Sequence, residues 1–124
     1  MRLLLDTHLL LWALSEPRRI GREGLALIDG AEVYVSAASI WEISIKSAQG
    51  KLKISLAAVL KAIVPAGFSH LPINGEHAAR VFDLGMHHND PFDRLLVAQA
   101  QLESMTLLSN DETLSAYGSF VHVL

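Results

Sequence analysis

Four acidic residues, Asp6, Glu42, Asp93 and Asp111, stand in or beside apolar stretches of the sequence and could together support metal-assisted chemistry. Carboxylates that converge raise one another's pKa, so such a cluster is stable at neutral pH mainly when a cation occupies it. The chain has no cysteine, and oxygen ligands favour Mg²⁺ or Mn²⁺ over zinc. A site of this kind suits phosphoryl transfer, because the metal polarises the phosphate and lowers the pKa of the attacking water.

Each of these acids also has a structural explanation. Asp6 could begin a helix, although a charge inside the run LLLDTHLLL is unfavourable unless something uses it. Glu42 could equally well pair with Lys46, one helical turn later. Asp111 could cap the short segment DETL. On spacing alone, the acids predict a metal site and favour an enzyme less strongly.

The segment HHNDPFDRLLVAQAQLE, residues 87 to 103, begins with polar residues and continues as a helix. Pro91 is a favoured first helical residue, which makes Asp90 the N-cap. Asp93 then occupies the third helical position, where it could complete a capping box at the positive end of the helix. Arg94 could pair with Asp90, four residues before it. The third position would also direct the Asp93 carboxylate at the sheet edge, so a capping role alone does not account for it.

The elements that must position these acids alternate between strand and helix. Strands are expected at residues 2–5, 32–35, 68–73, 105–109 and 120–124, and helices at 7–14, 21–30, 36–50, 55–64, 74–85 and 91–103, with a short helical turn at 111–118. This order predicts an α/β sandwich around a mostly parallel sheet. Ligands of such sheets bind beyond the carboxyl ends of the strands, where chain order puts Asp6 and Asp111. Glu42 and Asp93 would face the same edge from helices.

Composition limits the class of protein. The length of 124 residues is usual for one domain, and an apolar content of 51% indicates a globular chain with its own core. The absence of cysteine favours a reducing cytoplasm over secretion. A net charge of −3 gives no overall sign of nucleic-acid binding. The basic start imitates a signal peptide, but Asp6 and His8 interrupt an apolar run that is too short to span a membrane.

Other polar residues give weaker signals. His87 and His88 could contact a phosphate from the loop beside the acids, although most loop histidines are solvated. Trp41 is interpreted as a core or interface residue rather than a platform for bases. The sequence has no nucleophile elbow, P-loop or dinucleotide-binding glycine motif.

Four sequence blocks, LLLDTHLLLWAL, VSAASIWEISIK, HHNDPFDRLLVAQAQLE and LLSND, together resemble the PIN-domain ribonucleases, and specifically the VapC-type toxins of bacterial toxin–antitoxin pairs. The resemblance covers nearly the whole chain, in order and with comparable spacing. It implies a single PIN domain over residues 1–124, built as a three-layer sandwich with a central, mostly parallel sheet flanked by helices. It also implies a Mg²⁺- or Mn²⁺-dependent endoribonuclease that hydrolyses RNA in the cytoplasm.

The resemblance assigns roles to individual residues. The acidic positions of the family are matched, in order, by Asp6, Glu42, Asp93 and Asp111. All of these except Glu42 would hold the metal, and Glu42 would bind metal or orient the water. Matches in a supporting or substrate-binding position are Thr7, Asp90, Arg94 and Ser109. Of these, Arg94 would contact phosphate or an acid, and Ser109 keeps the hydroxyl of the threonine that the family often has.

Partners follow from the same resemblance. The proteins it resembles are usually homodimers, held inactive by a VapB-type antitoxin whose tail lies over the active site. An apolar groove is therefore expected, supplied by the exposed part of LLLWAL or by the helix around Trp41. Basic residues that could contact RNA are Arg18, Arg19, Arg22, Lys46, Lys51 and Lys53.

Other classes of protein fit less well. A haloacid-dehalogenase-like phosphatase needs a second aspartate two residues after the first, where this chain has His8. A phospho-acceptor receiver domain would need an aspartate after the strand at 32–35, where Ser36 stands. No helix-turn-helix or basic arm supports a DNA-binding antitoxin. A catalytically silent PIN-like module that binds metal or RNA in a regulatory role is the alternative left open, although none of the four acids is missing.

Overall fold

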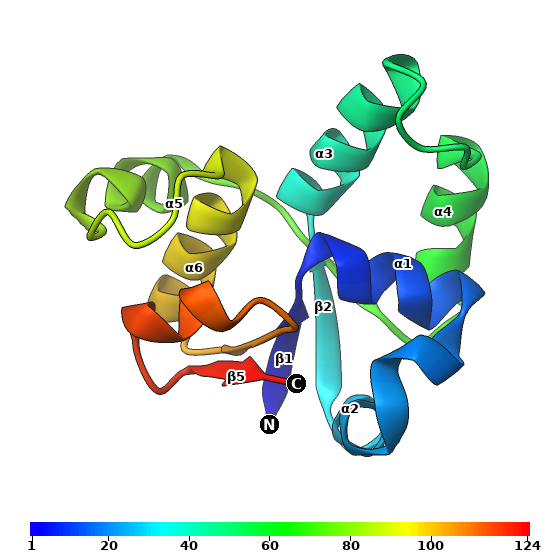
Figure 1. Cartoon of the computed structure of the whole chain (residues 1–124), viewed down its shortest axis with the longest axis horizontal. Coiled ribbons are helices and arrows are strands. Elements are labelled where there is room, and N and C mark those ends of the chain that lie inside the picture. The colour runs from blue at the N-terminus through cyan, green and yellow to red at the C-terminus, as the bar shows by residue number, and fades with distance from the viewer.

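Strands and helices alternate along the chain in the computed structural model, which describes residues 1–124 (Figure 1). The strands are β1 (Arg2–Leu5), β2 (Glu32–Ser36), β3 (Ser69–Leu71), β4 (Thr106–Ser109) and β5 (Val121–Val123). The α-helices are α1 (Thr7–Ser15), α2 (Gly21–Asp29), α3 (Ala37–Ala48), α4 (Leu56–Ile63), α5 (Gly75–Arg80) and α6 (Pro91–Glu103). Three short 3₁₀ segments are η1 (Pro17–Ile20), η2 (Val81–Asp83) and η3 (Glu112–Tyr117). No helix is long and apolar enough to cross a membrane.

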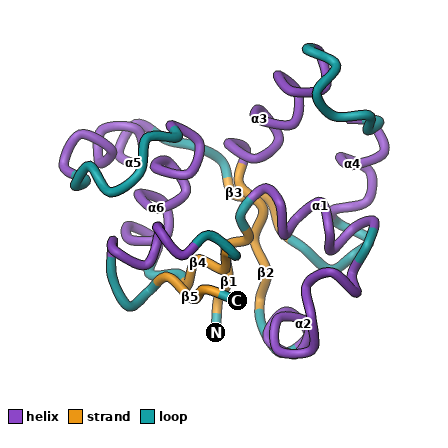
Figure 2. Tube along the Cα trace, in the orientation of Figure 1, coloured by secondary structure: helices purple, strands orange, loops and turns teal.

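The strands form one sheet in the order β3-β2-β1-β4-β5, and every neighbouring pair is parallel. The expected parallel sheet is thus confirmed, without any antiparallel strand. In Figure 2 the strands run through the middle of the molecule, with helices on both sides. Because both faces of a parallel sheet are covered, the buried part of its central strand is a continuous apolar run. Leu3, Leu4 and Leu5 of β1 accordingly have no exposed surface.

Two apolar clusters fill the space between the sheet and the helices. Successive side chains of a strand point to opposite faces, so Leu3 and Leu5 join one cluster and Leu4 joins the other. The first cluster contains residues of α1, α3 and α4, and the second contains four residues of α6 packed against residues of several strands. Figure 1 shows α1, α2 and α4 on one side of β1 and β2, with α5 and α6 on the other. The predicted three-layer α/β sandwich is confirmed.

The helix expected at 74–85 is shorter than predicted. The helix α5 ends at Arg80 and continues as the 3₁₀ segment η2, after which the chain is irregular as far as Asp90. The guanidinium of Arg94 donates hydrogen bonds to the carbonyl oxygens of Val81 at 3.2 Å and Gly85 at 2.9 Å. These bonds stabilise the carbonyl groups in a loop conformation, which replaces the last turns of the predicted helix.

Candidate functional site

A cleft of about 680 Å³ opens beyond the carboxyl ends of β1 and β4. Three of the predicted acids, Asp6, Asp93 and Asp111, line it together, although they come from distant parts of the sequence. The other residues that line the cleft are His8, Trp12, Arg19, Asn110 and Glu112. The position of the cleft follows the general rule for parallel α/β sheets, in which ligands bind at this edge.

Asp6 lies directly after β1 and caps helix α1. Its Oδ1 accepts a hydrogen bond from the Leu9 amide at 2.8 Å, and its Oδ2 accepts one from the Ser109 hydroxyl at 2.6 Å. The residue is only 4% exposed, and burial raises the pKa of Asp6 even though both hydrogen bonds act in the opposite direction. Ser109 also accepts a hydrogen bond from the Asp111 amide at 3.0 Å. One hydroxyl therefore joins the segments that carry two of the acids.

Asp90 caps helix α6, as expected. Its Oδ1 accepts hydrogen bonds from the amides of Phe92 at 2.8 Å and Asp93 at 3.0 Å. The reciprocal half of the predicted capping box, in which Asp93 would accept from the Asp90 amide, does not form. That amide instead donates to Nδ1 of His88 at 3.0 Å. The Asp93 carboxylate is thereby released from a capping role and lines the cleft.

The accumulated negative charge of the cluster shows in the pKa of Asp93. Burial is the largest cause that raises this pKa, the charges of Asp90, Asp6 and Glu42 raise it further, and the resulting value is about 7. The nearby ring of His88 acts in the opposite direction. A bound cation would relieve this repulsion, because it stabilises the ionised carboxylates that now oppose one another.

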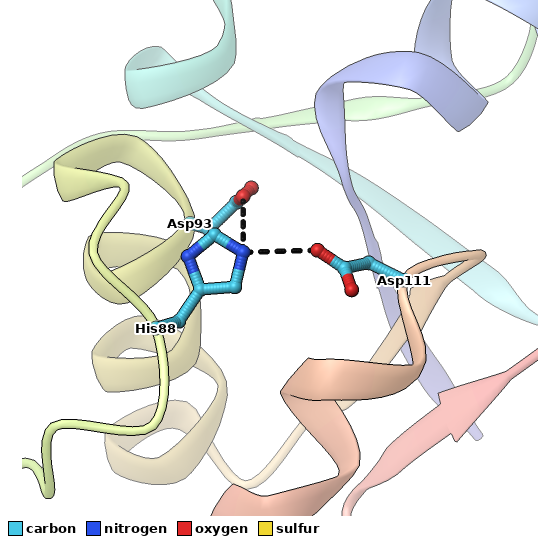
Figure 3. A group of neighbouring side chains, drawn as sticks. All are labelled: His88, Asp93 and Asp111. Atoms are coloured by element: carbon cyan, nitrogen blue, oxygen red, sulfur yellow. Dashed lines mark hydrogen bonds and ion pairs between the residues drawn. The ribbon is translucent and has the colours of Figure 1, made fainter.

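His88 lies between two of the acids, as Figure 3 shows. Its Nε2 is 2.9 Å from an oxygen of Asp111 and 3.5 Å from an oxygen of Asp93. Because Nδ1 accepts the Asp90 amide, a neutral ring carries its proton on Nε2 and directs it at the carboxylates. One ligand atom from each of the three residues lies within 4.8 Å of the others, close enough to share a metal ion.

His88 is only weakly indicated by its sequence context, because its loop position is typical of many solvated histidines. The signal that could have identified it is its place two residues before the N-cap Asp90. From there its ring can turn back to the cap amide and reach the cleft.

Asp111 caps the 3₁₀ segment η3, as predicted. Its Oδ1 accepts hydrogen bonds from the amide and the hydroxyl of Thr113, at 3.0 Å and 2.7 Å. The hydroxyl bond is the main reason that the pKa of Asp111 lies below its usual value. Its second oxygen, Oδ2, remains directed at His88. Asp111 is therefore held ionised in a fixed orientation at the rim of the cleft.

Glu42 is buried next to the cluster but does not line the cleft. Its Oε1 accepts a hydrogen bond from the Thr7 hydroxyl at 2.6 Å, and its Oε2 pairs with Lys46 at 2.6 Å. The ion pair one helical turn away, which the sequence offered as the structural role of Glu42, is thus present. It raises the pKa of Lys46, chiefly through the hydrogen bond to Glu42. Thr7 connects this pair to the first turn of α1, beside Asp6.

Arg94 holds the loop that carries His88. Besides Val81 and Gly85, its guanidinium bonds to the carbonyl oxygen of His88 at 3.3 Å and to the Tyr117 hydroxyl at 3.1 Å. The ion pair that the sequence suggested between Arg94 and Asp90 does not form, because these contacts occupy the guanidinium.

The donor set fits a hard divalent cation. The cleft offers carboxylate oxygens, and the chain has no thiol that would favour a softer metal. Four carboxylates line the cleft, those of Asp6, Asp93, Asp111 and Glu112, against the single guanidinium of Arg19, and a dication would reduce this excess of negative charge. Asp93 and Asp111 belong to the group whose ligand atoms lie within 4.8 Å of one another, and Asp6 lines the same cleft outside that group.

Known proteins share this fold. VapBC2 from Rickettsia felis, in a structure bound to a DNA fragment from its promoter, is similar with a TM-score of 0.73 and 15% identity, over 100% of this chain and 98% of that one. DNA-bound VapBC from Salmonella typhimurium gives a TM-score of 0.70 and 12% identity, over 100% and 97% of the two chains. FitAcB from Neisseria gonorrhoeae gives a TM-score of 0.66 and 21% identity, over 98% of this chain and 96% of that one.

These identities establish likeness of fold alone. A search of curated proteins finds no match. The family model of the PIN domain, in contrast, matches residues 3–119, which is nearly the whole chain and includes every predicted acid. The chain belongs to the PIN domain family.

Proposed function

We propose that this protein is a Mg²⁺- or Mn²⁺-dependent endoribonuclease and the toxin of a VapBC-type toxin–antitoxin pair. The observation that carries the proposal is the convergence of Asp6, Asp93 and Asp111 on one cleft of a PIN domain. The raised pKa of Asp93 supports a cation at this point. The pairing with an antitoxin is supported by the similar fold of proteins solved as VapBC complexes.

In the proposed mechanism, the residues of the protein position the metal and its ligands. Asp6, Asp93 and Asp111 would hold the metal, and a bound dication would supply polarisation of the scissile phosphate and a water of lowered pKa. Ser109 fixes Asp6 through its short hydrogen bond, so the carboxylate needs little reorganisation. Glu42, whose two oxygens accept from Thr7 and Lys46, would act on the cluster through its nearby charge.

The protein has surfaces that suit the partners expected of the proposed toxin. An apolar groove of about 290 Å³ lies between α1 and α4 and includes Leu11, Leu14, Ile54 and Val59. It begins in the LLLWAL segment, as expected for the groove that receives a VapB-type antitoxin. Exposed apolar side chains elsewhere, such as Phe82 at 91% exposed, support a homodimer. We expect the pair to act in the cytoplasm, with residues 1–124 as one PIN domain.

Cleavage of total cellular RNA by the purified protein, freed of any bound partner, tests the proposal. We expect discrete fragments with Mg²⁺ or Mn²⁺ and none with EDTA. Asp93→Asn should abolish cleavage, which excludes a contaminating nuclease. Asp29→Asn, a matched change at the exposed end of α2, should leave it unchanged. A wild-type rate in Asp93→Asn would refute the assignment of the site.

A catalytically silent module that binds metal or RNA is the second candidate. It is favoured by one observation: Glu42 is engaged by Lys46 and Thr7 rather than facing the cleft. Tight Mn²⁺ binding by the folded wild-type protein, without cleavage of any RNA in the sample, would support this candidate over a nuclease.

A further inference from the structure

The cleft has a second side, which the acids do not explain. Asp93 and Asp111 come from α6 and the loop after β4, whereas His8, Trp12 and Arg19 come from α1 and η1. Trp12 is the only apolar residue that lines the cleft, and Arg19 is its only lysine or arginine. An aromatic ring and a cation therefore share a cleft with the proposed metal ligands.

The geometry of this side resembles a nucleotide-binding surface. The guanidinium carbon of Arg19 lies 4.5 Å from the centroid of the Trp12 ring, a distance at which a cation–π interaction holds the two groups together. The imidazole of His8 follows, with its centroid 6.5 Å from that of Trp12 and its plane tilted by 47°. The three side chains thus form a continuous row along α1 and η1.

Arg19 is free to bind an anion. Its side chain takes part in none of the ion pairs of the structure and donates no hydrogen bond, although Glu112 lines the same cleft. A guanidinium presents paired N–H groups that match phosphate, and its flat face can stack on a base. By contrast, the acids of the cleft repel a phosphate backbone. A free cation beside them is therefore the group in this cleft best suited to retain a polyanion.

We propose that Arg19 and Trp12 bind a nucleotide of single-stranded RNA next to the scissile phosphate. This inference rests on the proposed function. The Arg19 guanidinium contacts a backbone phosphate, and an unpaired base stacks against the Trp12–Arg19 pair. Stacking of this kind requires bases that are not already stacked in a duplex, so the site selects single strands.

Binding measured apart from cleavage tests the inference. In the Asp93→Asn background, the anisotropy of a fluorescently labelled single-stranded RNA reports affinity without turnover. We expect Arg19→Ala to weaken binding about tenfold, because it removes a charge-assisted hydrogen bond. The slope of log affinity against log salt should become shallower by about 0.7, the value for one phosphate of a single strand that is no longer neutralised. Arg80→Ala, the same charge removed from α5 outside this cleft, should change neither quantity.

Two further measurements separate stacking from charge. Arg19→Lys should keep the salt slope but recover only part of the affinity, because an ammonium group cannot stack. In a Trp41→Phe background, Trp12 is the only tryptophan, and its emission should be quenched when the single strand binds but not when a duplex of the same sequence is added. This spectroscopic test avoids removing Trp12, whose ring also packs against the core.

Equal affinity in Arg19→Ala and Arg80→Ala, or unchanged Trp12 emission on binding of the single strand, would overturn the inference. The outcome is separable from that of the proposed function. Metal-dependent cleavage by the wild type, combined with either of those results, would leave the nuclease standing and remove only this binding role. If Arg19→Ala weakens RNA binding and Arg80→Ala does not, while the wild type cleaves no RNA, the binding role would stand and the nuclease activity would be removed.

Discussion

Two groups of polar side chains are buried in this protein, and they differ in charge. In the first, Gln99 accepts a hydrogen bond from the Ser36 hydroxyl and donates to the Pro72 carbonyl at 3.3 Å. It also lies 3.3 Å from Nδ1 of His77, whose Nε2 is 3.0 Å from a Glu103 oxygen. This group links β2, α5 and α6 and contains one carboxylate, which is partly exposed.

The second group surrounds the cleft and has an excess of carboxylates. Asp6, Glu42, Asp93 and Asp111 lie close enough for Asp6 and Glu42 to raise the pKa of Asp93. Neither group leaves a fully buried side-chain oxygen or nitrogen without a partner, since the only such atom in the structure is Oγ of Ser47. The difference is therefore one of charge rather than of bonding. A closed, nearly neutral network stabilises the fold, whereas a network with excess charge is suited to binding a cation.

Removing a carboxylate from the cleft should have the largest effect. Asp6→Asn keeps an oxygen that can accept from the Leu9 amide, so the cap of α1 survives. We expect the rate of RNA cleavage to fall by about a hundredfold or more, because a metal ligand contributes several kcal/mol to the transition state. The free energy of unfolding should stay equal or rise, since burial already disfavours the charge of Asp6. A variant that cleaves normally, or one that unfolds, would contradict the contrast between the two groups.

The closed network should respond in the opposite way. Gln99→Leu keeps a similar volume but removes the partner of Ser36 and one partner of His77. We expect the free energy of unfolding, measured by urea titration, to fall by about 2–3 kcal/mol, because buried polar groups lose their hydrogen bonds. Metal affinity and cleavage per folded molecule should stay unchanged. A loss of metal binding at full stability would show that the two groups are not independent.

Stability of the metal-free protein, measured as a function of pH, should reveal the carboxylate cluster, because the protein should become less stable as the pH rises. Because the pKa of Asp93 is raised to about 7, the folded protein binds a proton that the unfolded chain releases near pH 4. The contribution of Asp93 is therefore fully present below about pH 4 and is lost as the pH rises through about 7. Between pH 5 and 8, in EDTA, we expect the wild type to lose on the order of 2 kcal/mol more than Asp93→Asn. If the free energy of unfolding changes with pH in the same way for the two proteins, then ionisation of Asp93 does not destabilise the fold.

Much of the fold was predictable because it depends on local patterns. Short apolar runs separated by helical segments indicated all five strands and the order of the helices, and the cap at Asp90 formed as expected. The helix at 74–85 was too long in the prediction, since its end depends on hydrogen bonds from Arg94. No pattern within residues 74–85 reports a guanidinium that arrives from another helix.

The candidate site was predictable to the extent that chain order decides it. Asp6 and Asp111 follow parallel strands and so reach one edge of the sheet whatever the side chains do. The engagement of Glu42 by Lys46 and the place of His88 depend on rotamers and on competition for one amide, which spacing does not encode. Arg19 was one of several basic candidates, and only the structure distinguishes it, through its contact with Trp12 in the cleft.

The smallest expected effect concerns Ser109, which lies where the charged network meets the sheet. Its hydroxyl donates to Asp6 at 2.6 Å and accepts from the Asp111 amide at 3.0 Å, so it orients two proposed ligands without touching the metal. We expect Ser109→Ala to weaken Mn²⁺ binding, measured by calorimetry, by about tenfold, as for other residues that orient metal ligands. Ser109→Thr should restore most of the affinity, because threonine keeps the hydroxyl. Since Ser109 is fully buried, thermal unfolding of both variants must be followed as well. If both variants lose affinity equally while remaining folded, then packing at the end of β4, rather than the hydrogen bond, positions Asp6.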